Sequence, residues 1–129
     1  ELCELHSFKQ VHHMISTVEA EVLPTVSPVG VISATFPMGS MTGAPKISAM
    51  MIIEALEETK RGLYSGAVGY FTPNGDFDFN VVIRSILYNA SNSYVSFSVG
   101  SAITSKSTPQ REYEECLVKA KAMRSVLEN

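Results

Sequence analysis

Two turn sequences constrain the fold of this chain more than any other feature, because they leave three short strands in a row, at residues 63–71, 77–88 and 94–103. The first turn, TPNGD at residues 72–76, contains the Asn-Gly pair that favours tight hairpins, and the second is NASNS at residues 89–93. The strands are rich in β-branched and aromatic residues. Since short turns join antiparallel neighbours, the sequence predicts an antiparallel sheet built from hairpins.

Patterns on either side of this region complete an α+β plan. Residues 11–22 carry β-branched residues and partial alternation, which predicts a strand. A short helix is expected after Pro28, and a second helix runs from Pro45 to about Thr59 with a broad apolar face. The last element is a helix over residues 109–127. This order, with its longest run of strands joined by hairpins, predicts an antiparallel sheet covered on one face by helices.

Composition restricts the function as well as the fold. The chain has 129 residues, 45% of them hydrophobic and 18% charged, which indicates one globular domain. Its net charge of -3, with no basic run, argues against a nucleic-acid surface, and no apolar run is long enough to span a bilayer. Cys3 and Cys116 match no metal or redox spacing, so we expect reduced thiols in a cytoplasmic protein. The chain begins without methionine, and we expect it to be a piece of a longer protein.

Small and hydroxylated residues gather in GSMTGAPKISAMM, residues 39–51, around the start of the second helix. A turn needs one or two such residues, and this stretch holds more. The cluster indicates a backbone that approaches another group closely. Pro45 suits the first turn of a helix, because the N–H that it lacks would be unpaired there in any residue.

The last helix carries a charged stripe beside its apolar one. At about 100° per residue, Glu112, Glu115 and Lys119 fall within an arc of roughly 60° at the edge of the apolar face. Two carboxylates one turn apart repel mildly unless a cation lies near, and Mg²⁺ takes one or two protein carboxylates together with water and substrate oxygens. The alternative, which the spacing alone favours, is an exposed Glu115–Lys119 salt bridge. The apolar face is formed by Tyr113, Cys116, Leu117, Ala120, Met123 and Leu127.

Single residues elsewhere are weaker candidates for a site. His12 and His13 are neighbours on a strand, so they face opposite ways and only one can enter a shared site; a structural role is the alternative. Arg84 lies in an apolar strand and needs an anionic partner, either a ligand or a protein carboxylate. Tyr64 is an ordinary strand residue by position, and Gly100 at a strand end indicates a bulge or a close approach to a ligand.

Several motifs occur in the order and approximate spacing of the chorismate-utilising enzymes: VHHMIS, GSMTGAPKISAM, YSGAVGYF, DFNVVIRS, VGSAI and EYEECLVKA. The chain resembles this family over nearly its whole length. The resemblance implies an α+β fold like that of anthranilate synthase component I, of which residues 1–129 would form a C-terminal part. GSMTGAPK and DFNVVIRS resemble the aminodeoxychorismate branch, which aminates chorismate to 4-amino-4-deoxychorismate for para-aminobenzoate and folate synthesis. The anthranilate branch and a non-catalytic fold fragment are the alternatives.

The resemblance implies roles for the charged stripe and for two strand residues. Glu115 resembles the family's Mg²⁺ ligand, and Glu112 resembles the neighbouring acid that orders metal-bound water. Lys119 and Arg84 resemble the cations that bind substrate carboxylates. Tyr64 resembles the tyrosine that hydrogen-bonds the pyruvyl carboxylate. We expect these five side chains to meet at one cavity.

The remaining roles fall on small residues and one histidine. Gly100 resembles the glycine whose backbone N–H meets the pyruvyl carboxylate, and His13 resembles the histidine near the departing hydroxyl. Thr42 and Gly43 lie in the loop that closes against the ring in the family. Ala102 stands where the family usually has a second glycine, and its methyl group fills a point of backbone contact.

Other parts of the family's machinery have no counterpart in these residues. The lysine that adds to the ring, the general-acid glutamate and the other Mg²⁺-binding glutamate belong to a region that would precede Glu1. The family also implies Mg²⁺ as cofactor and a glutamine amidotransferase as the source of ammonia. We expect the chain by itself to be inactive, to expose an apolar face and to self-associate.

Overall fold

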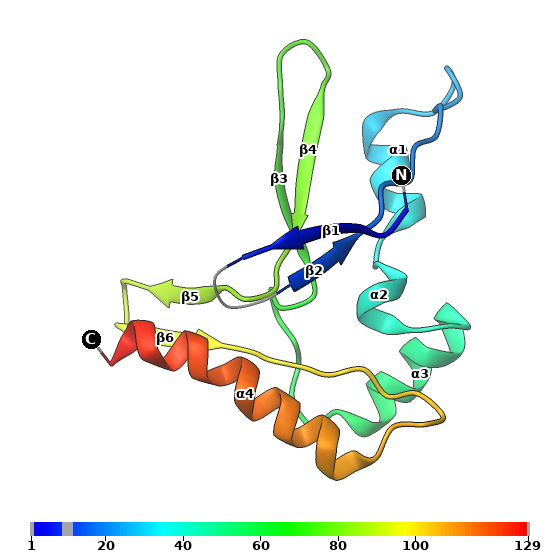
Figure 1. Ribbon diagram of the computed structural model, residues 1–129. Coiled ribbons are helices and arrows are strands. Elements are labelled where there is room, and N and C mark those ends of the chain that lie inside the picture. The colour runs from blue at the N-terminus through cyan, green and yellow to red at the C-terminus, as the bar shows by residue number, and fades with distance from the viewer. Residues whose placement is uncertain (1, 9–11, 129) are drawn as a thin grey trace. The chain divides into compact units, whose positions relative to one another are not determined.

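The computed structural model describes residues 2–8 and 12–128, and the α+β class expected from the sequence is confirmed (Figure 1). The chain divides into two compact units, residues 1–35 and residues 36–129. Its described strands form three two-stranded antiparallel sheets rather than one continuous sheet. Within the described residues, no helix combines the length and the apolar character needed to cross a membrane.

The first unit is a hairpin followed by a helix. Strand β1 (Glu4–Ser7) pairs with β2 (His12–Ile15), and His6 lies opposite His13 in the register. Helix α1 spans Pro28–Thr35, which confirms the short helix expected after Pro28.

The strand predicted over residues 11–22 is wrong beyond Ile15, and residue 11 lies outside the described residues. A strand continues only while a partner strand accompanies it. The extended backbone of β1 is interrupted at Cys3, which has a φ of 55°. The Cys3 N–H donates to the Ser16 hydroxyl at 3.0 Å, so a side chain takes the place of the next backbone partner.

The second unit contains three helices, α2 (Gly39–Thr42), α3 (Lys46–Leu56) and α4 (Pro109–Leu127). The bounds of α4 are those predicted. Helix α2 was not predicted; it is a single turn closed by a hydrogen bond from the Gly43 N–H to the Gly39 carbonyl at 2.8 Å. The small residues before α3 therefore form helix as well as loop.

Helix α3 differs from its predicted bounds at both ends. Pro45 is the N-cap of α3, with extended backbone, and the first helical residue is Lys46. The helix ends at Leu56 rather than near Thr59, because the backbone of Glu57 is extended with a ψ of 122°.

Both hairpins expected in the second unit are confirmed. Strand β3 (Ala67–Phe71) pairs with β4 (Phe77–Val81), and β5 (Ile86–Asn89) pairs with β6 (Tyr94–Phe97). In the first turn, Gly75 has a φ of 91°, a conformation that glycine adopts without strain.

Three strand bounds were predicted too long. The strand expected over residues 63–71 begins only at Ala67, because residues 62–65 form a turn in which Ser65 has a φ of 68°. The single strand expected over residues 77–88 is divided into β4 and β5, because Arg84 has a φ of 51° and turns the backbone out of the extended conformation. The third strand ends at Phe97, short of the predicted end at residue 103.

Packing in the described chain is sparse. Only Ser65 and Val82 are buried among these residues, with 7% and 8% of their surfaces exposed. They are linked by a hydrogen bond from the Ser65 N–H to the Val82 carbonyl at 3.0 Å, which extends the β3–β4 pairing toward Arg84. Leu56 and Ile103 are 75% and 74% exposed, as examples of many large apolar side chains. The exposed apolar surface that we expected is therefore confirmed for the described residues.

Helix α4 runs beside the segment that follows β6 (Figure 1). On its predicted apolar face, Cys116, Ala120 and Met123 are half-buried. The other members of that face, Tyr113, Leu117 and Leu127, are exposed. The helix is thus covered along one narrow stripe, which adjoins the charged residues Glu112, Glu115 and Lys119.

Candidate functional site

The start of α4 holds Glu112 in a favourable electrostatic position. Thr108 is the N-cap of α4, Pro109 occupies its first turn, and Glu112 lies in the same turn. Unpaired N–H groups give a helix N-terminus a partial positive charge, which stabilises a carboxylate there. Glu112 is half-buried and accepts a hydrogen bond from the Ser101 hydroxyl.

The segment after β6 is attached to α4 at a second point. The Lys119 ammonium donates to the Gly100 carbonyl oxygen, with 3.0 Å between the two atoms. The same ammonium pairs with the Glu115 carboxylate at 2.5 Å. Residues 100 and 101 are therefore held against α4 by Glu112 and Lys119, the first and last members of its charged stripe.

The ionisation of Glu115 reflects these contacts. Its pKa lies below the ordinary value, chiefly because of the hydrogen bond from Lys119, then because of the charge of Lys119, with a smaller effect of the nearby Ser101 hydroxyl. The Glu115–Lys119 salt bridge that the spacing suggested is present. Its presence does not exclude a binding role, since an ammonium has three donors and two of them are accounted for here.

The Tyr64 hydroxyl lies close to Gly100. A Cβ atom built on Gly100 would lie 2.6 Å from the Tyr64 hydroxyl oxygen, closer than any unstrained contact. The glycine therefore admits the hydroxyl, and no larger residue fits without a shift of one of them. The close approach expected at Gly100 is therefore explained in part by the side chain of Tyr64.

Arg84 occupies a strained backbone conformation between β4 and β5. Its φ of 51° lies in the left-handed region, which costs a residue with a Cβ atom about 1 kcal/mol. The turn is supported by a hydrogen bond from the Ser85 hydroxyl to the Ile83 carbonyl at 2.9 Å. Strain of this kind at a functional position is a common feature of binding sites.

A cavity of about 730 Å³ brings several of these residues together. This volume is within the range of pockets for small ligands. Tyr64, Arg84, Gly100 and Lys119 all line it, although they come from separate segments of the second unit. Of the side chains expected to meet there, Glu112 and Glu115 do not line the cavity but contact Ser101 and Lys119, which do.

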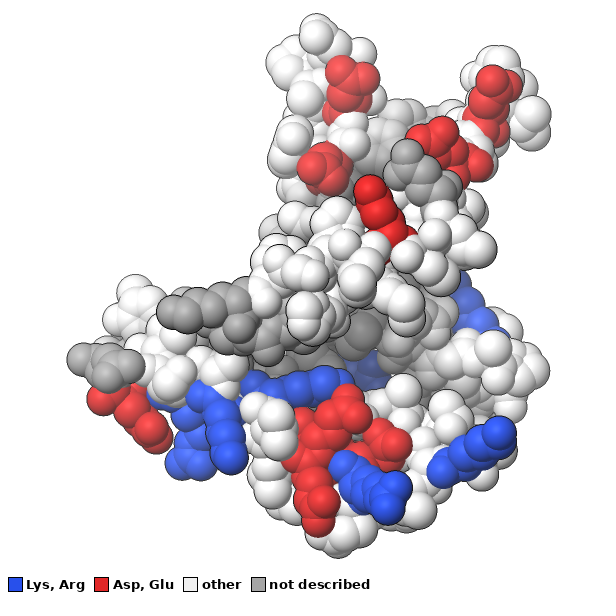
Figure 2. Space-filling view, viewed as in Figure 1, with Lys and Arg blue, Asp and Glu red and all other residues white. Residues whose placement is uncertain are grey.

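The charge of the cavity lining suits an anionic ligand. The basic residues that line it are Lys60, Arg61, Arg84 and Lys119, and the acidic ones are Glu57 and Glu58. The excess of basic residues contrasts with the chain's net charge of -3. On the face seen in Figure 2, by comparison, acidic and basic side chains lie intermixed over α4 at the bottom of the view.

Thr42 and Gly43 lie next to this cavity rather than on it. Thr42 lines a smaller cavity of about 240 Å³ together with Arg61 and Tyr64, and its hydroxyl donates to the Met38 carbonyl at 3.0 Å. Gly43 has a φ of 131°, and a Cβ atom there would lie 3.0 Å from that of Ala49. The neighbours of Thr42 in α2, residues 40 and 41, line the larger cavity.

His13 belongs to the first unit. It is half-buried in β2, and its ring meets the ring of Phe8 edge-on with 5.9 Å between centroids. His12 has a different partner, the Ser7 hydroxyl, at 2.9 Å from its Nδ1. The expected place of His13 near a departing hydroxyl stays a prediction.

Two residues that organise the site were not predicted from the sequence. Ser101 was considered only as part of the VGSAI motif, yet its hydroxyl binds Glu112. Arg61 was not considered, yet it lines both cavities and binds Glu57. The spacing Glu57-x-x-x-Arg61 was a signal for the second pair, but it falls after the end of α3 and does not follow helical geometry.

The oxygen donors of the site fit a hard divalent cation. Glu112 and Glu115 supply two carboxylates one helical turn apart, and the Ser101 hydroxyl lies beside them. Mg²⁺ commonly binds proteins through one or two carboxylates and completes its shell with water and substrate oxygens. In the described part of the chain, no cluster of three or more His, Cys, Asp or Glu side chains is placed to hold a metal ion.

Comparison with known families is consistent with this geometry. The family model described as chorismate binding enzyme matches residues 1–125. A solved structure, anthranilate synthase component I from Streptococcus pneumoniae, has the same fold with a TM-score of 0.81 and 36% sequence identity, over 95% of this chain and 28% of that one. The fold expected from the motifs is therefore confirmed.

The similar curated proteins carry two names, aminodeoxychorismate synthase and anthranilate synthase component 1. A probable aminodeoxychorismate synthase from Oryza sativa subsp. japonica is 46% identical over 98% of this chain, and aminodeoxychorismate synthase component 1 from Bacillus subtilis is 41% identical over 99% of it. Anthranilate synthase component 1 from Acetivibrio thermocellus is 38% identical over 98%. The chain spans 14%, 27% and 25% of the lengths of these relatives, respectively.

Proposed function

The chain belongs to the chorismate binding enzyme family, and on that basis we propose that it forms a C-terminal part of an aminodeoxychorismate synthase. The complete enzyme replaces the 4-hydroxyl group of chorismate by an amino group, toward para-aminobenzoate and folate. The observation that carries the proposal is the cavity lined by Tyr64, Arg84, Gly100 and Lys119. The choice of this activity is supported by relatives of that name that are 41–46% identical over nearly the whole chain.

The lining residues would act by binding and orienting the two carboxylates of chorismate. Arg84 offers a planar fork that matches a carboxylate with two parallel hydrogen bonds. Lys119 has a third N–H beyond those that bind Glu115 and the Gly100 carbonyl. The Tyr64 hydroxyl and the Gly100 backbone lie together, so both can donate to one oxygen of the substrate. These groups hold the ring in place for the loss of its hydroxyl.

Glu112 and Glu115 are the residues that would hold Mg²⁺, on the strength of their oxygen chemistry and their shared contact with Ser101. When bound, the ion would supply positive charge to a substrate carboxylate and favour departure of the hydroxyl.

Four further assignments belong to the same proposal. His13 would lie near the departing hydroxyl, and Thr42 and Gly43 would close against the ring. A glutamine amidotransferase subunit or domain would deliver ammonia. The location would be the cytoplasm, which cell fractionation with an antibody against this chain would test.

The test is product analysis with the protein as its gene encodes it. It would be incubated with chorismate and ammonium ions, with Mg²⁺ and with Mg²⁺ removed by a chelator. We expect 4-amino-4-deoxychorismate, and only in the presence of Mg²⁺. Anthranilate as the product would support the second candidate, which is favoured by the likeness to anthranilate synthase component I. Chorismate left unchanged in both cases would contradict both enzymatic proposals.

A further inference from the structure

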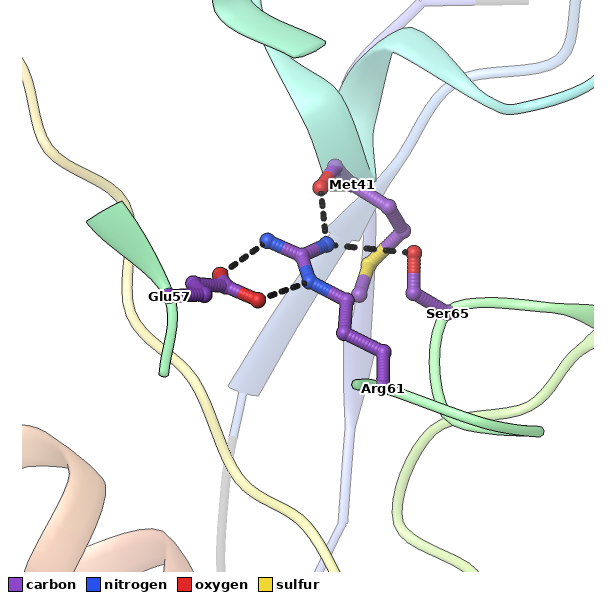
Figure 3. Close-up of polar contacts among 4 residues, drawn as sticks. All are labelled: Met41, Glu57, Arg61 and Ser65. Atoms are coloured by element: carbon purple, nitrogen blue, oxygen red, sulfur yellow. Dashed lines mark hydrogen bonds and ion pairs between the residues drawn. The ribbon is translucent and has the colours of Figure 1, made fainter. Parts of the chain in front are cut away.

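One guanidinium group connects three segments of the second unit (Figure 3). Arg61 donates from Nε and Nη2 to the two carboxylate oxygens of Glu57, at 2.8 Å and 2.6 Å. Its Nη1 donates to the Met41 carbonyl at 2.9 Å and to the Ser65 hydroxyl at 3.3 Å. The Arg61 side chain is 25% exposed and the Glu57 side chain is 41% exposed, so the pair is partly shielded from water.

Each partner of Arg61 stands beside a residue of the substrate cavity. Met41 lies in α2 and itself lines the cavity. Ser65 follows Tyr64, whose hydroxyl lies against Gly100. The backbone of Ser65 is paired with Val82, two residues before Arg84. The contacts of Arg61 therefore reach the backbone that supports both ligand-binding side chains.

We propose that Arg61, anchored by Glu57, is a positioning residue that fixes α2 and the Tyr64–Ser65 segment at the edge of the chorismate cavity. This inference rests on the proposed function. Arg61 acts through its neighbours, since its four N–H contacts are all to the protein.

The geometry requires a guanidinium rather than any cation. A carboxylate, a carbonyl and a hydroxyl lie in different directions around Arg61, and a rigid planar fork satisfies them together. A lysine ammonium carries the same charge but is a point donor on a flexible stem. The lowered pKa of Glu57, caused first by its hydrogen bond with Arg61, agrees with a persistent pair.

An ordinary surface salt bridge is the competing explanation, and the chain contains one with the same spacing. Arg124 and Glu128 form an i,i+4 pair at the end of α4, with 3.6 Å between Nε and Oε1 and both side chains 68% exposed. Pairs of this kind contribute little to stability. Arg124→Gln is therefore a matched control for Arg61→Gln.

The experiment uses the protein as its gene encodes it, with Arg61→Lys, Arg61→Gln, Glu57→Gln and Arg124→Gln. Steady-state kinetics with chorismate, hydrogen exchange of residues 39–43 and 64–66, and thermal unfolding are measured for each. We expect Arg61→Gln to raise KM about tenfold or more, because small misplacements of binding groups have large effects. Arg61→Lys should restore the unfolding temperature but not KM. Both segments should exchange faster in Arg61→Gln and Glu57→Gln, and Arg124→Gln should match the parent protein.

The outcomes separate this inference from the proposed function. A parent protein that leaves chorismate unchanged contradicts the proposed function, and hydrogen exchange alone then decides whether Arg61 fixes the two segments. An active parent with unchanged KM in both Arg61 variants overturns the inference while the function stands. Unchanged exchange in Arg61→Gln overturns it in either case. Failure of Arg61→Lys, Arg61→Gln and Glu57→Gln to fold also overturns it, because Arg61 would then serve the stability of the whole domain.

Discussion

At the scale of single residues, backbone strain and the proposed binding role meet at Arg84. Arg84 lines the cavity, while its backbone has a φ of 51°, which glycine adopts more readily than arginine. A sequence selected only for stability would place glycine or asparagine at such a position. The arginine is therefore best explained by the ligand that we propose for the cavity.

A comparison of two small substitutions at Arg84 tests this explanation. Both Arg84→Gly and Arg84→Ala remove the guanidinium, but only glycine relieves the left-handed strain. We expect Arg84→Gly to be more stable than Arg84→Ala by about 0.5–1 kcal/mol, and both to lose chorismate binding. Urea unfolding and equilibrium binding measure the two effects. Equal stability of the variants would mean that Arg84 relaxes to an ordinary conformation in solution.

The Glu57–Arg61 pair should make the stability of the fold depend on pH. The pKa of Glu57 in the folded chain lies below its ordinary value of 4.5, so the pair stabilises the fold fully above that value and loses its effect as the pH falls through the lower folded pKa. Glu57→Gln removes this contribution. Because the Glu57 side chain is 41% exposed, we expect the loss to be about 1 kcal/mol or less at neutral pH.

The pH dependence of unfolding checks that prediction. The difference in unfolding temperature between the parent and Glu57→Gln should be present from about pH 5 upward and should shrink below about pH 4. A difference that grows as the pH falls has the wrong sign for a carboxylate with a lowered pKa. That outcome would contradict the pairing.

At the scale of elements, the sequence predicted those with strong local signals. Helix α4 has its predicted bounds, because Pro109 can begin a helix and a long amphipathic pattern follows it. The β3–β4 and β5–β6 hairpins were predicted from their turns. These features depend on neighbours in the sequence, so local reasoning was sufficient.

Elements that depend on distant partners were predicted less well. The extent of β2 is limited by a partner strand that ends near Cys3, and the break between β4 and β5 comes from the conformation of Arg84. The gathering of Tyr64, Arg84, Gly100 and Lys119 followed from the family resemblance and not from spacing. The contacts of Ser101 with α4 and of Arg61 with α2 depend on tertiary structure, and no local pattern indicated them.

At the scale of elements, the segment that contains Tyr64 approaches the segment that contains Gly100 closely. In Gly100→Ala the new methyl group would lie 2.6 Å from the Tyr64 hydroxyl oxygen but 3.7 Å from the ring carbon that carries it. We expect Gly100→Ala to destabilise the protein by about 1–3 kcal/mol, as overpacking does.

Removal of the hydroxyl should remove the conflict. The double variant Gly100→Ala, Tyr64→Phe should therefore be about as stable as Tyr64→Phe alone, with a positive coupling between the two sites in a double-mutant cycle. Chemical denaturation of the four proteins measures this coupling. Additive effects would mean that the two loops separate in solution.

At the scale of the whole molecule, the exposed apolar surface is the dominant feature. Only two residues are buried among those described, while many large apolar side chains face solvent. Apolar patches of this extent favour association. The short two-stranded sheets also leave strand edges without a partner strand among the described residues, which favours pairing between copies.

We therefore expect the 129-residue chain, produced by itself, to self-associate and to leave chorismate unchanged. Light scattering across a range of concentrations and an assay for chorismate consumption measure these properties. Charged substitutions at Leu56 and Ile103, which are exposed, should weaken the association without unfolding the chain. A monomer at all concentrations would contradict the first expectation, and turnover would contradict the second.

The central claim is that Tyr64, Arg84, Gly100 and Lys119 together bind the carboxylates of chorismate. The most direct measurement is a crystal structure of the protein, as its gene encodes it, with chorismate and Mg²⁺. The account predicts that one carboxylate lies within about 3 Å of Tyr64 and Gly100, with Arg84 and Lys119 also in hydrogen-bond contact with the ligand. Chorismate bound elsewhere, or bound in this cavity without contact to Arg84 and Lys119, would contradict the account.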